Sequence, residues 1–289
     1  MSRLTIFTPT YNRAKFLPKC YESLLKQTNQ DFIWQIVDDG SSDGTEALIQ
    51  SYINEGRIEI EYFWQENGGK ASAINRSLEK TTTPFWLCLD SDDYLFSTAV
   101  DQLLSACEDI KDDNSICGVF AVRSDSSGRP MKGRDVPDNV EYATQLEIRY
   151  HYCVKPEYVQ AYKTAVINKY RFPQYEGEKF VTESWMQDQI DQEYKFKVIH
   201  GAIMACEYLP DGLTKNYYRL IKKNPRGFLV FYAQRIDLCK RLKPRIVAAM
   251  FYNAIYDLLG DKRYAKKKHW LISVTALPSK IMKRKLTLI

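Results

Sequence analysis

Short apolar runs alternate with helix-like segments through the first 125 residues, and this alternation narrows the possible folds more than any other feature. Strands that are separated by helices pair in parallel, and such sheets are covered by helices on both faces. The crossovers should be right-handed. The predicted strands are Leu4–Thr8, Phe32–Val37, Ile58–Phe63, Phe85–Leu89 and Cys117–Val122, and the predicted helices are Lys15–Gln27, Gly44–Ile53, Ala71–Lys80 and Thr98–Asp109. The sequence therefore predicts an α/β domain built on a mostly parallel sheet. From Glu141 to Tyr208 the alternation gives way to a mixed pattern.

The last part of the chain is helical in pattern and basic. Apolar residues recur every four positions from Ile246 to Leu258, between Pro244, which should start a helix, and Gly260, which should end it. From residue 225 to 289 there are 15 Lys/Arg and three Asp/Glu, whereas the rest of the chain has 26 and 33. A basic tail on an acidic body favours an anionic surface, such as a membrane, as its partner. A solvated helical subdomain and a dimer interface are the alternatives, so a homo-oligomer stays open.

Several classes of protein are disfavoured. The seven cysteines are odd in number and form no C-x-x-C pair, which indicates reduced thiols in the cytoplasm rather than a disulfide framework. The three histidines are far apart and have no metal-ligand spacing. No apolar window is long enough to span a membrane, and no signal peptide is recognisable. We expect a cytoplasmic protein, with the basic tail directing it to the inner face of the plasma membrane.

Polar residues gather directly after the predicted strands, where open α/β sheets bind ligands. The segment Thr8–Arg13 follows the first strand and suits a base pocket, or a helix-capping turn. Asp38 and Asp39 follow the second strand, where buried carboxylates need hydrogen-bond partners such as a base N–H or a ribose hydroxyl. Asp43 and Glu46 have the spacing of a capping box for the next helix.

A pair of glycines follows the third strand. Gly68 and Gly69 precede a predicted helix and allow the backbone to approach a ligand closely. Lys70 at the start of that helix is unfavourable for the helix dipole, which indicates an anion nearby. A flexible turn with a solvated lysine is the alternative.

The most specific cluster is Asp90, Ser91, Asp92 and Asp93 after the fourth strand. In extended chain, Asp90 and Asp92 present their carboxylates on one side. Hard oxygen ligands without cysteine or histidine suit Mg²⁺ or Mn²⁺ bridging a diphosphate. A helix cap would not need three acids in four positions.

These four motifs, in this order, resemble family-2 glycosyltransferases of the GT-A fold. They are TPTYNR (8–13), VDDGSSDGT (37–45), NGGK with AIN (67–75) and LDSDD (89–93). The resemblance is strong over about 110 residues, weaker to about 210 and absent beyond. It implies a Rossmann-like GT-A domain over residues 1–215, in which 1–110 bind the nucleotide sugar and 111–215 help bind the acceptor. A basic helical region, 216–289, would follow.

The resemblance also implies a nucleotide-diphosphate sugar as donor, with UDP as the expected nucleotide, and Mn²⁺ or Mg²⁺ as cofactor. The expected donor-binding residues are Thr8, Pro9, Tyr11, Asp38, Asp39, Gly69, Lys70, Asn75, Asp90 and Ser91. Thr8 and Asp39 would contact the base, and Asp38 would support their loop. Asp92 would bind the metal directly, and Asp90 would face both ribose and metal.

The resemblance places the catalytic base in the second half. Residues 180–185 resemble the family's acidic element before a helix, with Glu183 as first choice and Asp188 as second. Ser184 departs from the usual Glu-Asp pair. Asp211 lies where many relatives carry a histidine metal ligand and is the candidate replacement.

The implied reaction is hexosyl or N-acetylhexosaminyl transfer with inversion. The acceptor would be a hydroxyl of a cell-envelope or capsular glycan, or of a lipid-linked acceptor. A nucleotidyltransferase would share the sheet, carboxylates and metal. A catalytically inactive nucleotide-sugar-binding protein is a further alternative, although the intact Asp90 and Asp92 argue against it. No nucleic-acid-binding module is recognisable, so we expect no nucleic acid partner.

Overall fold

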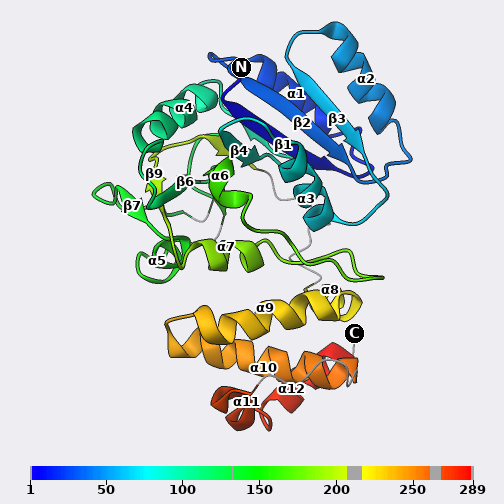
Figure 1. The fold of residues 1–289 in the computed structure, drawn as a ribbon, viewed down its shortest axis with the longest axis vertical. Coiled ribbons are helices and arrows are strands. Elements are labelled where there is room, and N and C mark those ends of the chain that lie inside the picture. Colours follow the sequence, from blue (N-terminus) through cyan, green and yellow to red (C-terminus); the bar gives the residue numbers. More distant parts are fainter. Residues whose placement is uncertain (1, 132, 156, 207–216, 261–267, 288–289) are drawn as a thin grey trace. The chain divides into compact units, whose positions relative to one another are not determined.

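The structure, a computed structural model, describes residues 2–287 except 132, 156, 207–216 and 261–267. The chain forms two compact units (Figure 1). The sheet unit comprises Met1–Arg171 and Glu193–Tyr208, and the helical unit comprises Phe172–Gln192 and Leu209–Ile289. This division differs from the expected boundary at residue 215, because residues 172–192 belong with the C-terminal helices.

The sheet unit contains an eight-stranded sheet in the order β3-β2-β1-β4-β8-β6-β9-β7. Every neighbouring pair is parallel except those that involve β8 and β7, so the sheet is mostly parallel, as predicted. The strands are β1 Leu4–Thr10, β2 Phe32–Asp38, β3 Ile60–Trp64, β4 Phe85–Cys88, β6 Ile116–Val122, β7 Tyr142–Ala143, β8 Tyr158–Lys163 and β9 Lys195–Val198. A separate two-stranded sheet pairs β5, Tyr94–Leu95, with β10, Met204–Ala205.

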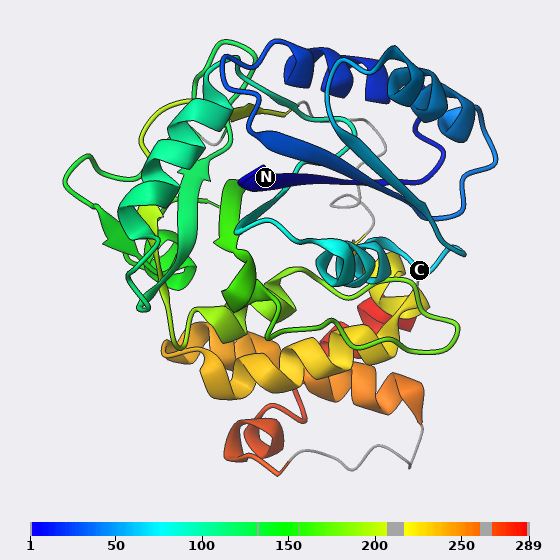
Figure 2. The same ribbon diagram turned by 45° about the horizontal axis from the view of Figure 1, so that its top comes forward.

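Helices cover both faces of this sheet. The helices of the sheet unit are α1 Leu17–Leu25, α2 Thr45–Glu55, α3 Lys70–Lys80, α4 Ala99–Ile110, α5 Gln145–Tyr150 and α6 Thr164–Ile167. Figure 2 shows the blue helices α1 and α2 on one side of the blue strands and the cyan helix α3 on the other. The five predicted strands and four predicted helices of the first 125 residues are confirmed within a few residues at their ends.

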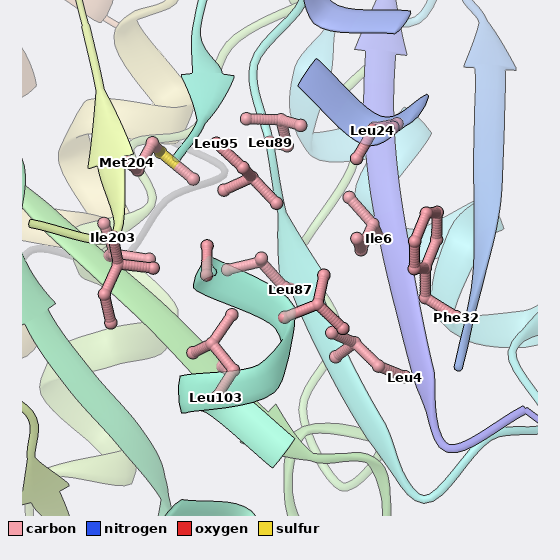
Figure 3. Close-up of a cluster of buried hydrophobic side chains, with 14 of the residues drawn as sticks. Leu4, Ile6, Leu24, Phe32, Leu87, Leu89, Leu95, Leu103, Ile203 and Met204 are labelled. Carbon is pink, nitrogen blue, oxygen red and sulfur yellow. The ribbon is translucent and has the colours of Figure 1, made fainter. Parts of the chain in front are cut away.

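The main core lies between the sheet and α1, α2 and α4. Leu4 and Ile6 of β1 pack there with Leu24 of α1 and Leu103 of α4 (Figure 3). On the opposite face, Trp86 of β4 donates a hydrogen bond to Ser77 of α3 (2.8 Å), and Ser77 in turn donates to Gln35 of β2 (2.5 Å). Both faces of the central strands are therefore buried.

The capping box predicted at Asp43 and Glu46 is wrong. Helix α2 has Gly44 as its N-cap and no side-chain cap. The Asp43 carboxylate instead accepts hydrogen bonds from the backbone N–H groups of Thr45 (3.0 Å) and Ala14 (3.2 Å). A local bond to Thr45 together with a tertiary contact to the loop after β1 thus takes the place of the capping box.

The helical unit consists of helices of five to 18 residues around an aromatic core. Its helices are α7 Ser184–Ile190, α8 Tyr217–Lys223, α9 Pro225–Leu238, α10 Leu242–Leu259, α11 Trp270–Val274 and α12 Ser279–Thr287. Tyr232 of α9 stacks on Phe251 of α10 with ring centroids 4.8 Å apart. Helix α10 starts two residues before the predicted Pro244 and ends at Gly260 in the left-handed conformation, as predicted. Within the described residues, every helix is too short or too polar to cross a bilayer.

Candidate functional site

Parallel register brings the four polar motifs to one edge of the sheet. Thr10 at the end of β1 pairs with Asp38 at the end of β2, and Asp38 pairs with Trp64 at the end of β3. Strand β4 lies on the other side of β1, with Phe7 opposite Cys88. The loops that follow these four strands therefore start side by side, in the crevice where such sheets bind ligands.

The Asp39 carboxylate joins the loops after β2 and β3. It accepts hydrogen bonds from the backbone N–H groups of Gly68 (2.8 Å) and Gly69 (2.7 Å) and from the Gln65 side-chain amide (2.7 Å). Asp39 is buried, and these donors compensate the cost of burying its charge. Gly69 has a φ of +86°, which L side chains rarely adopt. A carboxylate has about four lone-pair sites, and these three donors occupy three of them.

Asp38 supports the same loop from inside the sheet. Its side chain is fully buried and accepts hydrogen bonds from the backbone N–H of Ser41 (2.8 Å) and the hydroxyl of Tyr62 (2.9 Å). Burial and the bond to Asp38 raise the pKa of the Tyr62 phenol, which therefore stays a donor. Because its buried carboxylate makes these contacts, Asp38 supports the loop rather than contacting a ligand.

Asn12 fastens the loop after β1 to the loop after β2. It has a left-handed backbone with φ of 53°, which asparagine tolerates better than most residues. Its side-chain oxygen accepts from the backbone N–H groups of Ser42 (2.8 Å) and Asp43 (3.3 Å), and its own N–H donates to the Ser41 hydroxyl (2.9 Å). The motifs after β1 and β2 therefore form one connected rim.

A charged network lies at the end of β4. The Lys70 ammonium is 2.5 Å from Asp90 Oδ1, and the Arg123 guanidinium is 3.5 Å from Asp90 Oδ2. Arg123 also pairs with Asp93 at 2.8 Å. Burial opposes ionisation of Asp90, but Lys70 and Arg123 more than offset this and lower its pKa to about 2. Asp90 is therefore a carboxylate at neutral pH.

Asp93 behaves differently from Asp90. It is 4% exposed, and burial raises its pKa to about 7 despite the neighbouring Arg123. Asp93 is therefore a buried partner that holds Arg123 in position. Sequence reasoning missed Arg123, although it directly follows the apolar strand β6 and so occupies a strand end like the other motifs.

Asp92 points to a different basic group. Its carboxylate is 3.7 Å from the Arg13 guanidinium, and its side chain is 25% exposed, close to the 24% of Asp90. Among the residues that the structure describes, no group of three or more Asp, Glu, His or Cys is placed to hold a metal ion. Residues 90–93 form a turn closed by a hydrogen bond from the backbone N–H of Asp93 to the carbonyl of Asp90 (3.0 Å), so the expectation of an extended chain with Asp90 and Asp92 on one side is wrong. The two carboxylates contact different basic groups, and a metal held by either would take further ligands from substrate or water.

The other residues that were expected to bind the nucleotide sugar differ in how far they are exposed. Thr8 is fully buried, and its hydroxyl accepts a hydrogen bond from the Trp34 indole (2.9 Å). The Thr8 side chain therefore faces the core, and the expected contact of Thr8 with a base stays a prediction for its backbone. Tyr11 is 50% exposed and Pro9 is partly buried. Asn75 of α3 and Ser91 are buried.

Comparison with known proteins decides the family. A family model described as glycosyl transferase family 2 matches residues 5–171, more than half of the chain. The chain belongs to glycosyl transferase family 2. The matched region contains all four polar motifs and Arg123.

Curated relatives match part of this family-2 chain. The teichoic acid poly(glycerol phosphate) polymerase of Staphylococcus epidermidis is 39% identical over 101 residues, which are 35% of this chain and 14% of that protein. The poly(ribitol-phosphate) β-N-acetylglucosaminyltransferase TarS of Staphylococcus aureus is 26% identical over 183 residues, 60% of this chain and 30% of TarS. The chain thus spans less than a third of the length of these two relatives.

Solved structures of glycosyltransferases share the fold. S. aureus TarS 1–349 in complex with UDP-GlcNAc superposes with a TM-score of 0.63 at 19% identity, covering 88% of this chain and 71% of that one. The mannosyltransferase PcManGT from Pyrobaculum calidifontis, in complex with GDP-Man and Mn²⁺, gives a TM-score of 0.55 at 16% identity, covering 99% and 84%. The predicted GT-A fold of this family-2 chain is confirmed.

The candidate bases of this family-2 chain lie beyond the matched region. Glu183 is exposed at the start of α7. Asp188 is 1% exposed and forms a bidentate pair with Arg235 of α9, at 2.6 and 3.2 Å. The alternative assignment of Asp188 as base is therefore wrong, since its two oxygens hold α7 against α9 inside the helical unit. Asp211 lies outside the described residues.

We predict that Asp188→Ala destabilises the protein by about 3–5 kcal/mol, because it removes the fully buried carboxylate of the ion pair with Arg235. Replacing both partners, as Asp188→Leu with Arg235→Leu, should recover most of that loss. The free energy of unfolding of both variants and the wild type in urea measures the effect. A fully stable Asp188→Ala protein would contradict the structural role.

Proposed function

We propose that this family-2 chain transfers a hexosyl or N-acetylhexosaminyl group from a nucleotide-diphosphate sugar, most readily a UDP-sugar, to a hydroxyl of a cell-envelope or capsular glycan or a lipid-linked acceptor, with inversion. The observation that carries the proposal is the meeting of Asp90, Lys70 and Arg123 at the carboxyl edge of the sheet. The relatives support the donor and acceptor classes: a teichoic acid polymerase, TarS bound to UDP-GlcNAc, and a mannosyltransferase bound to GDP-Man.

The two accessible carboxylates fit a divalent cation. Asp90 is ionised at neutral pH, and Asp90 and Asp92 are both partly exposed. Mg²⁺ is commonly held by one or two carboxylates together with substrate phosphates and water, so a site formed by Asp90 or Asp92 would not need a third protein carboxylate. When bound there, Mg²⁺ or Mn²⁺ supplies positive charge against the diphosphate.

The basic side chains of the site orient the donor. Lys70 begins α3 and is 32% exposed, so its ammonium can turn from Asp90 toward a diphosphate oxygen. Arg123 is held by Asp93 and presents a second cation next to Asp90. Asp39 keeps one acceptor position for a base N–H, while the exposed ring of Tyr11 is available for stacking.

Glu183 is the proposed general base. The acceptor oxygen attacks the anomeric carbon, the bond from that carbon to the diphosphate oxygen breaks, and its electron pair leaves with the nucleoside diphosphate. The hydroxyl proton passes to the Glu183 carboxylate. Attack opposite the leaving group inverts the anomeric configuration. Glu183 is exposed, as a group that meets an acceptor must be.

The leaving group distinguishes this reaction from its alternatives. We expect the purified protein with Mn²⁺ to release a nucleoside diphosphate from one nucleotide sugar in a panel of UDP-, GDP- and TDP-sugars. A nucleotidyltransferase would release pyrophosphate instead, and an inactive binding protein would bind the donor without turnover. Chromatography of the nucleotide products separates these outcomes, and either of the last two would refute the proposal.

We predict that Asp92→Ala abolishes sugar transfer together with metal-dependent nucleotide binding, because it removes one of the two partly exposed carboxylates that directly follow β4. Calorimetric titration of the nucleotide with and without Mn²⁺ measures the binding, and diphosphate release measures the transfer. Asp112→Ala, which changes an exposed acid outside the site, is the matched control and should behave as wild type. Wild-type turnover by Asp92→Ala would remove Asp92 from the metal site.

We predict that Glu183→Gln keeps the donor affinity and lowers the transfer rate by about 10²–10⁴-fold, the usual contribution of a general base. Glu176→Gln alters an exposed glutamate of the same unit and should leave the rate unchanged. Donor titration and initial rates distinguish binding from chemistry. If Glu183→Gln transfers sugar as fast as wild type, another group is the base.

A further inference from the structure

Large apolar side chains are exposed at the C-terminal end of the helical unit. Trp270 is 59% exposed, Val274 61%, Leu277 72% and Ile281 63%. They follow one another at spacings of four, three and four residues on α11, the turn after it and α12. We name these four residues the apolar row. One exposed apolar residue is ordinary, but several large ones close together in the chain usually mark an interaction surface.

The rest of this segment is anchored, which keeps the apolar row outside. Leu271 and Leu286 are buried in the core of the helical unit, where α11 and α12 pack against α10. Asn253 of α10 donates hydrogen bonds to the carbonyl of Ile272 (2.8 Å) and the hydroxyl of Thr275 (3.1 Å). Helix α11 lies on the side of α10 away from α9 (Figures 1 and 2). Because these contacts bury the opposite side of the segment, the apolar row is exposed to solvent.

The stretch of chain that carries the apolar row is basic. From residue 268 to 287 the chain has no Asp or Glu and five basic residues. These are Lys268, Lys280, Lys283, Arg284 and Lys285, of which all but Lys283 are exposed. Tryptophan and aliphatic residues next to lysine and arginine are typical of segments that lie in the interface of an anionic bilayer.

We propose that the apolar row and its basic neighbours form a docking surface for an anionic lipid bilayer. Trp270, Leu277 and Ile281 enter the boundary between headgroups and acyl chains, and the basic side chains contact lipid phosphates. A second copy of the chain fits this surface less well. The cores of protein interfaces are depleted in lysine, and a two-fold interface would bring two uncompensated basic clusters together. The inference goes beyond the proposed transfer reaction and does not depend on it.

The first test removes the apolar contacts. Full-length protein is floated with vesicles of phosphatidylglycerol and phosphatidylcholine, and with vesicles of phosphatidylcholine alone. We expect wild type to bind the anionic vesicles, and Trp270→Ser/Leu277→Ser/Ile281→Ser to bind at least about tenfold more weakly. These side chains are exposed, so folding should persist, which circular dichroism checks. Tyr142→Ser, at a residue 41% exposed on β7, is the matched control and should bind as wild type.

The second test reverses the charge. Lys280→Glu/Arg284→Glu/Lys285→Glu should lower the partition coefficient on anionic vesicles by about 100-fold or more, since each basic residue near such a surface contributes about fivefold. Lys26→Glu/Lys111→Glu/Arg129→Glu introduces the same charge change at exposed positions of the sheet unit and should retain binding.

Three results would overturn the proposal. Failure of the wild type to float with anionic vesicles removes the docking surface, and so does flotation of the apolar and charge variants at the wild-type level. The third is a wild-type dimer that the serine variant converts to a monomer without changing vesicle binding, measured by light scattering, which would make the apolar row a dimer interface. Vesicle binding is measured without donor, so a failure of the transferase proposal leaves these results interpretable.

Discussion

The burial of the central strands on both faces is the constraint on which the sheet unit depends. Strands β1 and β2 are buried along nearly their whole length, so a polar side chain inside them needs a partner. Thr8 finds one in Trp34, and Gln35 finds one in Ser77. Polar groups that must meet a ligand are therefore displaced to the ends of the strands. Because the strands are parallel, those ends share one edge.

Two kinds of compensation hold the acids at that edge. Asp39 is surrounded by neutral donors, including the backbone amides of Gly68 and Gly69, whereas Asp90 is surrounded by cations. The glycine amides that the sequence suggested for close approach to a ligand are thus already donors to Asp39. In the proposed function, the protein's own positive charge for the donor therefore comes from side chains, chiefly Lys70 and Arg123.

The sequence predicted the first 125 residues well because their periodicity is local. It did not resolve β8, whose place between β4 and β6 depends on antiparallel partners far along the chain. Arg123 was missed because its partners Asp90 and Asp93 come from another strand end. Asp188 was misread because its partner Arg235 is 47 residues away and only the packed helical unit brings them together. Features that follow from local periodicity were predictable, whereas those that depend on partners distant in the sequence were not.

The helical unit is interleaved in sequence, and this limits how its pieces can be exchanged. Phe180 stacks on Phe228, and Gln234 donates a hydrogen bond to the carbonyl of Trp185, so the segment before residue 192 and the C-terminal helices share one core. A chimera that grafted only the C-terminal helices of a relative would pair them with a foreign α7. Both segments have to be exchanged together in a chimera, because the two stretches of chain form one structural unit.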